Sequence, residues 1–175
     1  MAEGVFLSIL NREGQSSNFN IDSAGTLGVH IGELADRRMR FFAEKRGYTL
    51  MHRSRKFTRA DFGKFDWIIV MDDRNFDDVK SMAMTSEEVS KIHRMVDFCQ
   101  KSDATYVPDP YYGGDQGFEN VIDLLEDACE GLLVAVSSKN NSLTTKEILF
   151  NHQKSVRGKL RKSQLAGRLK YSYDN

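Results

Sequence analysis

The 175-residue chain has little cysteine, little proline and no net charge: two cysteines, two prolines and equal numbers of acidic and basic residues. It also lacks an apolar run of the ~18 or more residues that a membrane-spanning helix needs. Its first ten residues do not combine a basic segment with a clean apolar stretch, so a secretory signal peptide is not predicted. These absences predict a cytoplasmic protein.

The two cysteines, Cys99 and Cys129, lie 30 residues apart and do not form a C-x-x-C motif. This spacing favours neither a zinc site nor the disulfide framework of a secreted protein, so we expect two buried thiols. His30 and His93 belong to no H-E-x-x-H or similar spacing, and no metal site is predicted.

The zero net charge hides two unlike regions. Residues 139–175 contain 9 Lys and Arg against 2 Asp and Glu, a net charge of +7, whereas residues 1–138 carry −7. The composition predicts one globular domain over residues 1–138 and a basic, flexible tail over residues 139–175. Binding of nucleic acid or an acidic membrane surface through residues 139–170 is the alternative for this tail.

Hydrophobic periodicity predicts alternating helices and short strands. Strands are predicted over residues 19–23, 67–71 and 94–98. Helices are predicted over residues 2–10, 37–46 and 118–133. Asp36 is the predicted N-cap of the second helix, and residues 85–88 form a capping box. This order favours a three-layer α/β fold in which a short, mostly parallel sheet has helices on both faces. Ligands of such folds bind beyond the carboxyl ends of the strands.

Both prolines flank one acidic residue, Asp109, in the segment VPDPYYGG. Proline fixes its own φ and restricts the residue before it, so the order Pro108-Asp109-Pro110 holds the carboxylate in a defined direction. Tyr111 and Tyr112 follow directly. A purely structural alternative is that Asp109 caps a turn and that the two tyrosines are partly buried aromatic residues.

Residues 1 to about 133 resemble the low-molecular-weight protein tyrosine phosphatases, most closely the bacterial members. The ordered motifs that carry this resemblance are MAEGVF (residues 1–6), DSAGT (22–26), H-x-G-E (30–33), D-x-R-M (36–39), K-R-G (45–47), H-R-S-R-x-F-T (52–58), D-F-x-x-F-D (61–66), V-M-D (70–72), VPDPYYGG (107–114) and FENVIDLLEDACEGLL (118–133). VPDPYYGG is the most specific of them.

The resemblance implies a fold, a reaction and a set of site residues. In this family a cysteine thiolate attacks the phosphorus of phosphotyrosine, and Asp109 would be the general acid that protonates the leaving phenolate. Tyr111 and Tyr112 match the aromatic residues that flank the substrate ring, and Ser23 matches a serine that supports the phosphate loop. His52 and Asp72 match recurrent positions for which we expect structural roles.

The same resemblance implies the ligands and partners. It implies no cofactor and no metal. The expected substrates are phosphotyrosyl proteins, which in bacteria include autophosphorylating tyrosine kinases.

The chain departs from the family at the motif that defines it. Cys-x5-Arg-Ser/Thr, which in the family follows the first strand and precedes the helix that here begins at Met1, is absent, and neither cysteine is followed by an arginine at this spacing. We therefore expect the chain as given to be inactive. Residues 27–29 also lack an aromatic residue that many relatives use as a wall of the substrate cleft.

Several explanations are open. A start assigned at an internal methionine, or a truncated gene, would explain the missing motif, as would a non-catalytic relative that acts as a binding module. An arsenate reductase on the same fold is a further alternative, against which DPYYGG argues.

The missing motif also predicts a defect in the sheet. The resemblance implies the family's strand order, 2-1-3-4, which places its first strand between the first and second of the strands predicted above. We expect this central slot to be empty, which would leave backbone groups unpaired at a cost of ~1–3 kcal/mol for each buried group. Ile148-Leu149-Phe150 is the one apolar run in the tail that could enter it.

Overall fold

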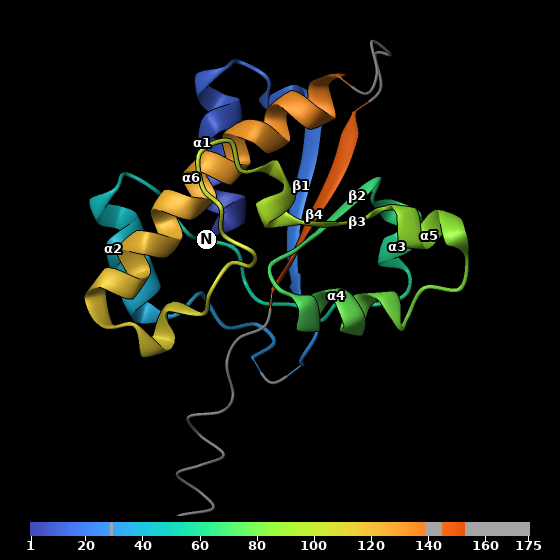
Figure 1. Ribbon diagram of the computed structural model, residues 1–175, viewed down its shortest axis with the longest axis horizontal. Helices are drawn as coiled ribbons and strands as arrows, with labels where there is room; N and C mark the ends of the chain where they lie inside the picture. Colours follow the sequence, from blue (N-terminus) through green and yellow to red (C-terminus); the bar gives the residue numbers. More distant parts are fainter. Residues whose placement is uncertain (29, 139–144, 153–175) are drawn as a thin grey trace, which may run out of the picture.

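Four parallel strands form the centre of the molecule, in the spatial order β1-β4-β2-β3. The computed structural model describes residues 1–28, 30–138 and 145–152. The strands are β1 (Phe19–Gly25), β2 (Trp67–Val70), β3 (Ile92–Arg94) and β4 (Lys146–His152). The predicted three-layer α/β fold is confirmed (Figure 1).

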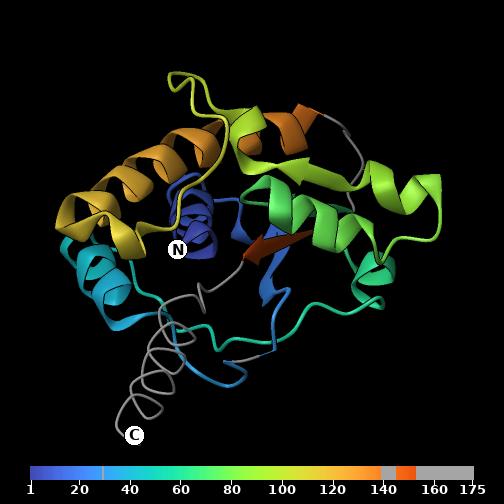
Figure 2. The same cartoon turned by 60° about the horizontal axis from the view of Figure 1, so that its bottom comes forward.

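Helices cover both faces of this sheet (Figures 1 and 2). The α-helices are α1 (Ala2–Arg12), α2 (Arg37–Lys45), α3 (Asp61–Lys64), α4 (Asp73–Lys80), α5 (Ser86–Ser90) and α6 (Gly114–Ser138), and the 3-10 helices are η1 (Ser16–Asn18), η2 (Met95–Phe98) and η3 (Pro110–Tyr112). Within the described part of the chain, no helix is both long and apolar enough to span a membrane.

The expectation of an empty central slot is wrong. Strand β4 occupies it, and Ile148 pairs with Ile21 of β1 on one side and with Trp67 of β2 on the other. The pairing supplies partners for the backbone groups that flank the slot, so the penalty expected for unpaired groups does not arise. Residues 146–152 of the predicted tail form this strand. For the rest of the tail the prediction is untested, because residues 139–144 and 153–175 lie outside the described residues.

The alternating side chains of β4 join two hydrophobic cores. Ile148 and Phe150 face α1 and α6, where the Phe150 ring lies 5.8 Å from that of Phe6 in an edge-to-face contact. Leu149 points to the other face and packs with residues of α3 and α4, such as Phe62. A strand buried on both faces has a continuous apolar sequence, as Ile148-Leu149-Phe150 does.

Local sequence signals set the helix ends. The Asp36 side chain accepts hydrogen bonds from the backbone N–H groups of Arg38 and Met39, at 2.8 and 3.3 Å, and begins α2 as predicted. The strand predicted over residues 94–98 is corrected, because β3 ends at Arg94 and Met95–Phe98 is a 3-10 helix. The Asp97 carboxylate accepts a hydrogen bond from the Arg94 N–H at 3.3 Å, which favours the turn.

Candidate functional site

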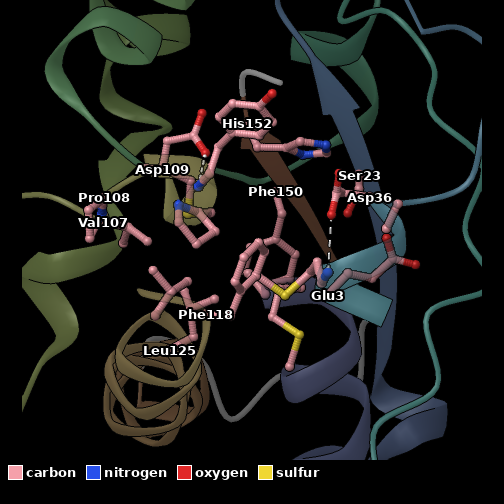
Figure 3. Close-up of a pocket in the computed structure, with 18 of the residues that line it drawn as sticks. Glu3, Ser23, Asp36, Val107, Pro108, Asp109, Phe118, Leu125, Phe150 and His152 are labelled. Atoms are coloured by element: carbon pink, nitrogen blue, oxygen red, sulfur yellow. Dashed lines mark hydrogen bonds between the residues drawn. The ribbon is translucent and has the colours of Figure 1, made fainter. Parts of the chain in front are cut away.

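A cavity of about 480 Å³ opens at the carboxyl ends of β1, β4 and β2. Its walls come from the N-terminus of α1, the segments after β2 and before α2, the loop that holds Asp109, and α6 (Figure 3). This is the place where parallel α/β sheets bind ligands. Four predicted site residues line it: Ser23, Asp72, Asp109 and Tyr111.

Hydrogen bonds fix the loop that carries Asp109 on both sides of this residue. The Val107 N–H donates a hydrogen bond of 2.8 Å to the carbonyl oxygen of Met71, directly after β2. Asp109 then accepts a hydrogen bond of 2.9 Å from the Tyr111 N–H, which caps η3. Pro108 and Pro110 restrict the backbone between these two contacts. Asp109 therefore has a defined position on the cavity wall, where it is exposed to solvent (Figure 3).

Tyr111 also lines the cavity. Its side chain is 47% exposed, and the Arg38 guanidinium lies 4.8 Å from the centre of its ring. A cation over the ring face restrains an aromatic side chain that remains open to solvent. The Tyr112 side chain, also predicted to flank the substrate, lies outside the described part of the structure.

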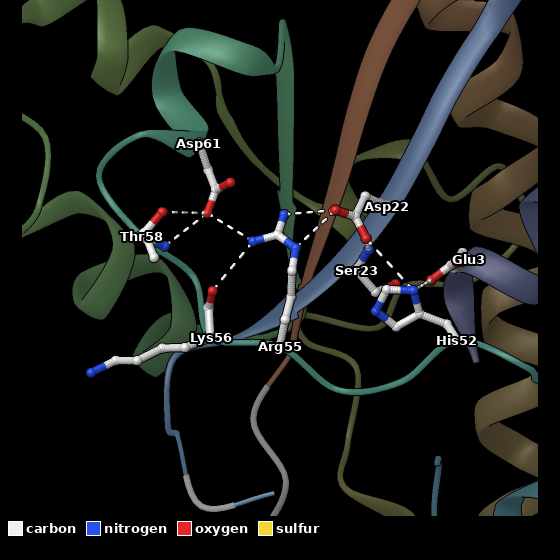
Figure 4. Close-up of polar contacts among 8 residues, drawn as sticks. All are labelled: Glu3, Asp22, Ser23, His52, Arg55, Lys56, Thr58 and Asp61. Atoms are coloured by element: carbon white, nitrogen blue, oxygen red, sulfur yellow. Dashed lines mark hydrogen bonds and ion pairs between the residues drawn. The ribbon is translucent and has the colours of Figure 1, made fainter. Parts of the chain in front are cut away.

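Ser23, Asp72 and His52 were the supporting residues expected from the sequence. Ser23 is buried on β1, and the Asp72 side chain caps α4 by accepting a hydrogen bond of 2.6 Å from the Asn75 N–H. His52 does not line the cavity; its Nδ1 lies 3.6 Å from carboxylate oxygens of both Glu3 and Asp22. His52 thus links the start of α1 to β1, beside Ser23 (Figure 4).

An arginine extends this polar contact away from the cavity (Figure 4). Arg55 binds the carboxylates of Asp22 and Asp61, with shortest N–O distances of 2.8 and 2.9 Å. Burial opposes its charge, but hydrogen bonds with Asp61 and Asp22 outweigh burial and raise the pKa of Arg55. Asp61 is almost fully buried, so the arginine compensates a carboxylate that would otherwise lose its hydration. This pairing fixes β1 behind the cavity.

His152 is a cavity residue that the sequence motifs did not predict. It is the last residue of β4, the central strand, and lines the cavity that also contains Asp109 (Figure 3). Because side chains alternate along a strand, His152 lies on the same face as Ile148 and Phe150. The signal that could have identified it was the histidine two residues after an apolar run able to fill the central slot.

Neither cysteine lines the cavity. Cys129 is fully buried on α6, where its Sγ lies 3.8 Å from the carbonyl oxygen of Ala2, and burial raises the pKa of its thiol. Cys99 is half-buried rather than buried as predicted, and burial together with the nearby Asp127 raises its pKa as well. Raised pKa values disfavour the thiolate that nucleophilic attack requires.

Two buried amides lie near the carboxyl ends of the central strands. Asn75 lines the cavity; its Oδ1 accepts a long hydrogen bond of 3.4 Å from the Met71 N–H, while its Nδ2 has no hydrogen-bond partner among the described residues. Asn151 precedes His152 on β4, and within the described ranges neither its Nδ2 nor its Oδ1 has a hydrogen-bond partner. In the same part of the chain, no group of three or more His, Cys, Asp or Glu is arranged to hold a metal ion.

Comparison with known proteins matches this chain to a protein family. Residues 1–143 match the family described as low molecular weight phosphotyrosine protein phosphatase. A protein of Synechocystis sp. named as a low molecular weight protein-tyrosine-phosphatase is 39% identical over 138 residues, which cover 79% of this chain and 88% of the relative. The low molecular weight protein-tyrosine-phosphatase YfkJ of Bacillus subtilis is 34% identical over 140 residues, with the same coverage of this chain and of the relative.

Solved structures give the same result. A crystal structure of the protein tyrosine phosphatase from Entamoeba histolytica superposes with a TM-score of 0.75 and 41% identity, over 78% of this chain and 87% of the other. The crystal structure of YfkJ gives a TM-score of 0.74 and 33% identity, over 80% and 87% of the two chains. The family match ends at residue 143 and therefore does not include β4.

Proposed function

Because the chain belongs to the low molecular weight phosphotyrosine protein phosphatase family, we propose that its cavity receives the phosphorylated side chain of a tyrosine in a protein, with Asp109 as the general acid. The observation that carries this proposal is the position of Asp109. Its loop is anchored to the end of β2, and Asp109 lines the cavity at the carboxyl ends of β1 and β4.

The chemistry of an aryl phosphate explains why an acid belongs there. A phenolate is a poor leaving group until it is protonated, and a positioned acid typically accelerates such a step by ~100 to 10,000-fold. Tyr111 beside Asp109 supplies an exposed aromatic surface for the phenyl ring of the substrate. Tyr112 has the same proposed role, by resemblance alone.

Ser23, His52 and Asp72 act in this proposal as supports. Asp72 holds the start of α4, and His52 holds α1 against β1. Ser23, buried on β1, forms part of the cavity wall. Such contacts keep a site rigid without touching the reacting atoms.

We further propose that no cysteine of this chain attacks the phosphorus. Cys99 and Cys129 are absent from the cavity wall, and the pKa values of both thiols are raised. A binding module for phosphotyrosine is the second candidate function, and the cavity without a thiol in its described wall favours it. The tyrosine-kinase partner and the cytoplasmic location stay predictions.

Binding and turnover should be measured separately. We expect a phosphotyrosine peptide to bind, by titration calorimetry, more tightly than the same peptide with tyrosine or phosphoserine, and Tyr111→Ala to weaken this binding. A double variant, Cys99→Ser with Cys129→Ala, should retain whatever hydrolysis of aryl phosphates the parent chain has. Equal affinity for the phosphorylated and unphosphorylated peptides would contradict the proposed ligand, and loss of hydrolysis in the folded double variant would contradict the exclusion of cysteine.

A further inference from the structure

We propose that His152 is the phosphoryl-accepting residue of this cavity, so that a ring nitrogen of histidine takes the phosphoryl group from an aryl phosphate. The inference rests on the proposed function for its substrate. It depends on one juxtaposition: an imidazole at the carboxyl end of the central strand and an acid on the facing loop line the same cavity (Figure 3).

The position of His152 is set by a rigid element. The backbone of β4 pairs with β1 as far as Gly25 and His152, and the preceding residues are buried on both faces. A side chain at the end of such a strand is held more precisely than one on a loop. His152 is half-buried at the end of this strand.

Other nucleophilic side chains on the cavity wall are less suited to this role. Ser23 is only 6% exposed, and a serine hydroxyl needs a base to remove its proton. His30 lies on the segment before α2, and its Nδ1 is 2.7 Å from a carboxylate oxygen of Glu33. His152 differs from Ser23 because a neutral imidazole attacks without first losing a proton, and from His30 because it ends a strand instead of lying on a loop segment.

The surroundings of the cavity can accommodate a phosphoryl group. The N-terminus of α1, an 11-residue helix, contributes Ala2 and Glu3 to the wall, and the first N–H groups of a helix have no partner within it. Asn75 adds a fully buried side chain whose Nδ2 donor is unpaired within the described residues. Both features offer donors to phosphoryl oxygens.

Carboxylates in the same wall already have electrostatic partners. Asp36 and Asp72 cap helices α2 and α4 and accept backbone hydrogen bonds there. Glu3 lies 3.6 Å from Nδ1 of His52. Favourable contacts with helix N-termini and with a histidine reduce the repulsion that a phosphate dianion would meet.

The reaction balances without any further reagent. The lone pair of one His152 ring nitrogen forms a bond to phosphorus, the P–O bond to the phenol breaks, and the leaving oxygen takes the proton of Asp109. Water then attacks phosphorus, its proton passes to the Asp109 carboxylate, and the electrons of the P–N bond return to the imidazole. The products are the phenol and inorganic phosphate, and both residues regain their starting state.

This scheme predicts a trapped intermediate. p-Nitrophenol leaves with little need for an acid, whereas hydrolysis of the phosphorylated imidazole needs the Asp109 carboxylate as a base. Incubation of the full chain as Asp109→Asn with p-nitrophenyl phosphate should therefore accumulate phosphate on His152. We expect one phosphate per chain, labile in acid and stable in alkali, with the modified residue identified by tandem mass spectrometry.

Two further variants make the test decisive. Asp109→Asn with His152→Gln should give no acid-labile phosphate, while Asp109→Asn with His93→Gln, which removes an imidazole outside the cavity wall, should give the same amount as Asp109→Asn alone. Thermal melting and binding of the phosphotyrosine peptide check that the His152→Gln chain is folded.

The possible failures are distinct. Absence of acid-labile phosphate in a chain that binds the phosphotyrosine peptide overturns the role of His152 alone. Phosphate that persists without His152, or that lies on another residue, overturns it too. Absence of peptide binding in the parent chain overturns the proposed function itself.

Discussion

The candidate site joins two regions that are held in opposite ways. The acid loop, residues 107–114, is mostly exposed and is kept in place by two prolines, one hydrogen bond to Met71 and the cap of η3. Strand β4 ends at His152, is paired on both edges and is buried on both faces. The difference indicates that residues of the loop can be changed for chemistry alone, whereas changes in β4 act first on stability.

The largest loss of stability is expected when a buried side chain of β4 is removed. Phe150 is 1% exposed and packs against Phe6, so Phe150→Ala should lower the free energy of unfolding by ~3–5 kcal/mol. Tyr111→Ala, on the exposed loop, should change it by ~0.5 kcal/mol or less. Urea unfolding measures both. Similar losses for the two variants would mean that β4 is not the better packed region.

A change in the loop should give the reverse pattern. With His152 as the proposed phosphoryl acceptor, we expect Asp109→Asn to slow the release of a basic phenol from an aryl phosphate by ~100 to 10,000-fold. Its free energy of unfolding should barely change, because the amide oxygen can still accept the hydrogen bond from the Tyr111 N–H. A series of phenols should show a larger loss of rate as the phenol becomes more basic.

The matched control is Asp103→Asn, an exposed acid outside the cavity wall, which should leave the rates unchanged. A rate loss in Asp109→Asn that is the same for acidic and basic phenols would contradict a role in protonation.

The two regions also differ in what the sequence reveals. The loop is a local signal, since Pro108, Asp109 and Pro110 restrict one another directly, and the apolar face of α6 follows from its 3.6-residue period. Strand β4 is too short for periodicity to identify its partners, and its place between β1 and β2 depends on segments more than 70 residues away. The role of His152 depends on that placement, so sequence motifs alone did not predict it.

Asn151 is a polar residue within the buried part of β4. Its amide is fully buried and unpaired within the described residues, and a buried unpaired polar group costs ~1–3 kcal/mol. Asn151→Val should therefore raise the free energy of unfolding by ~1 kcal/mol, with Val also favoured in a strand. Asn20→Val, on the exposed side of β1, is the control and should have a smaller effect. A loss of stability in Asn151→Val would instead indicate that the amide has a partner.

The smallest expected effect concerns the helix that follows the acid loop. The Tyr48 hydroxyl donates a hydrogen bond of 2.8 Å to Glu126 on α6, and burial, with this hydrogen bond, raises the pKa of Tyr48 from 10.0 to about 12. The folded state thus holds the Tyr48 proton more tightly than the unfolded state. The stability that this proton contributes is therefore complete below pH 10.0 and is lost as the pH rises through about 12.

The free energy of unfolding of the wild type should exceed that of Tyr48→Phe by ~0.5–1.5 kcal/mol at neutral pH, which is the usual net value of a hydrogen bond. Urea unfolding of both proteins across this range should show the difference shrinking in alkali, because the difference between the two cancels the titration of other groups. A constant difference would mean that α6 is held at Tyr48 by packing rather than by this hydrogen bond.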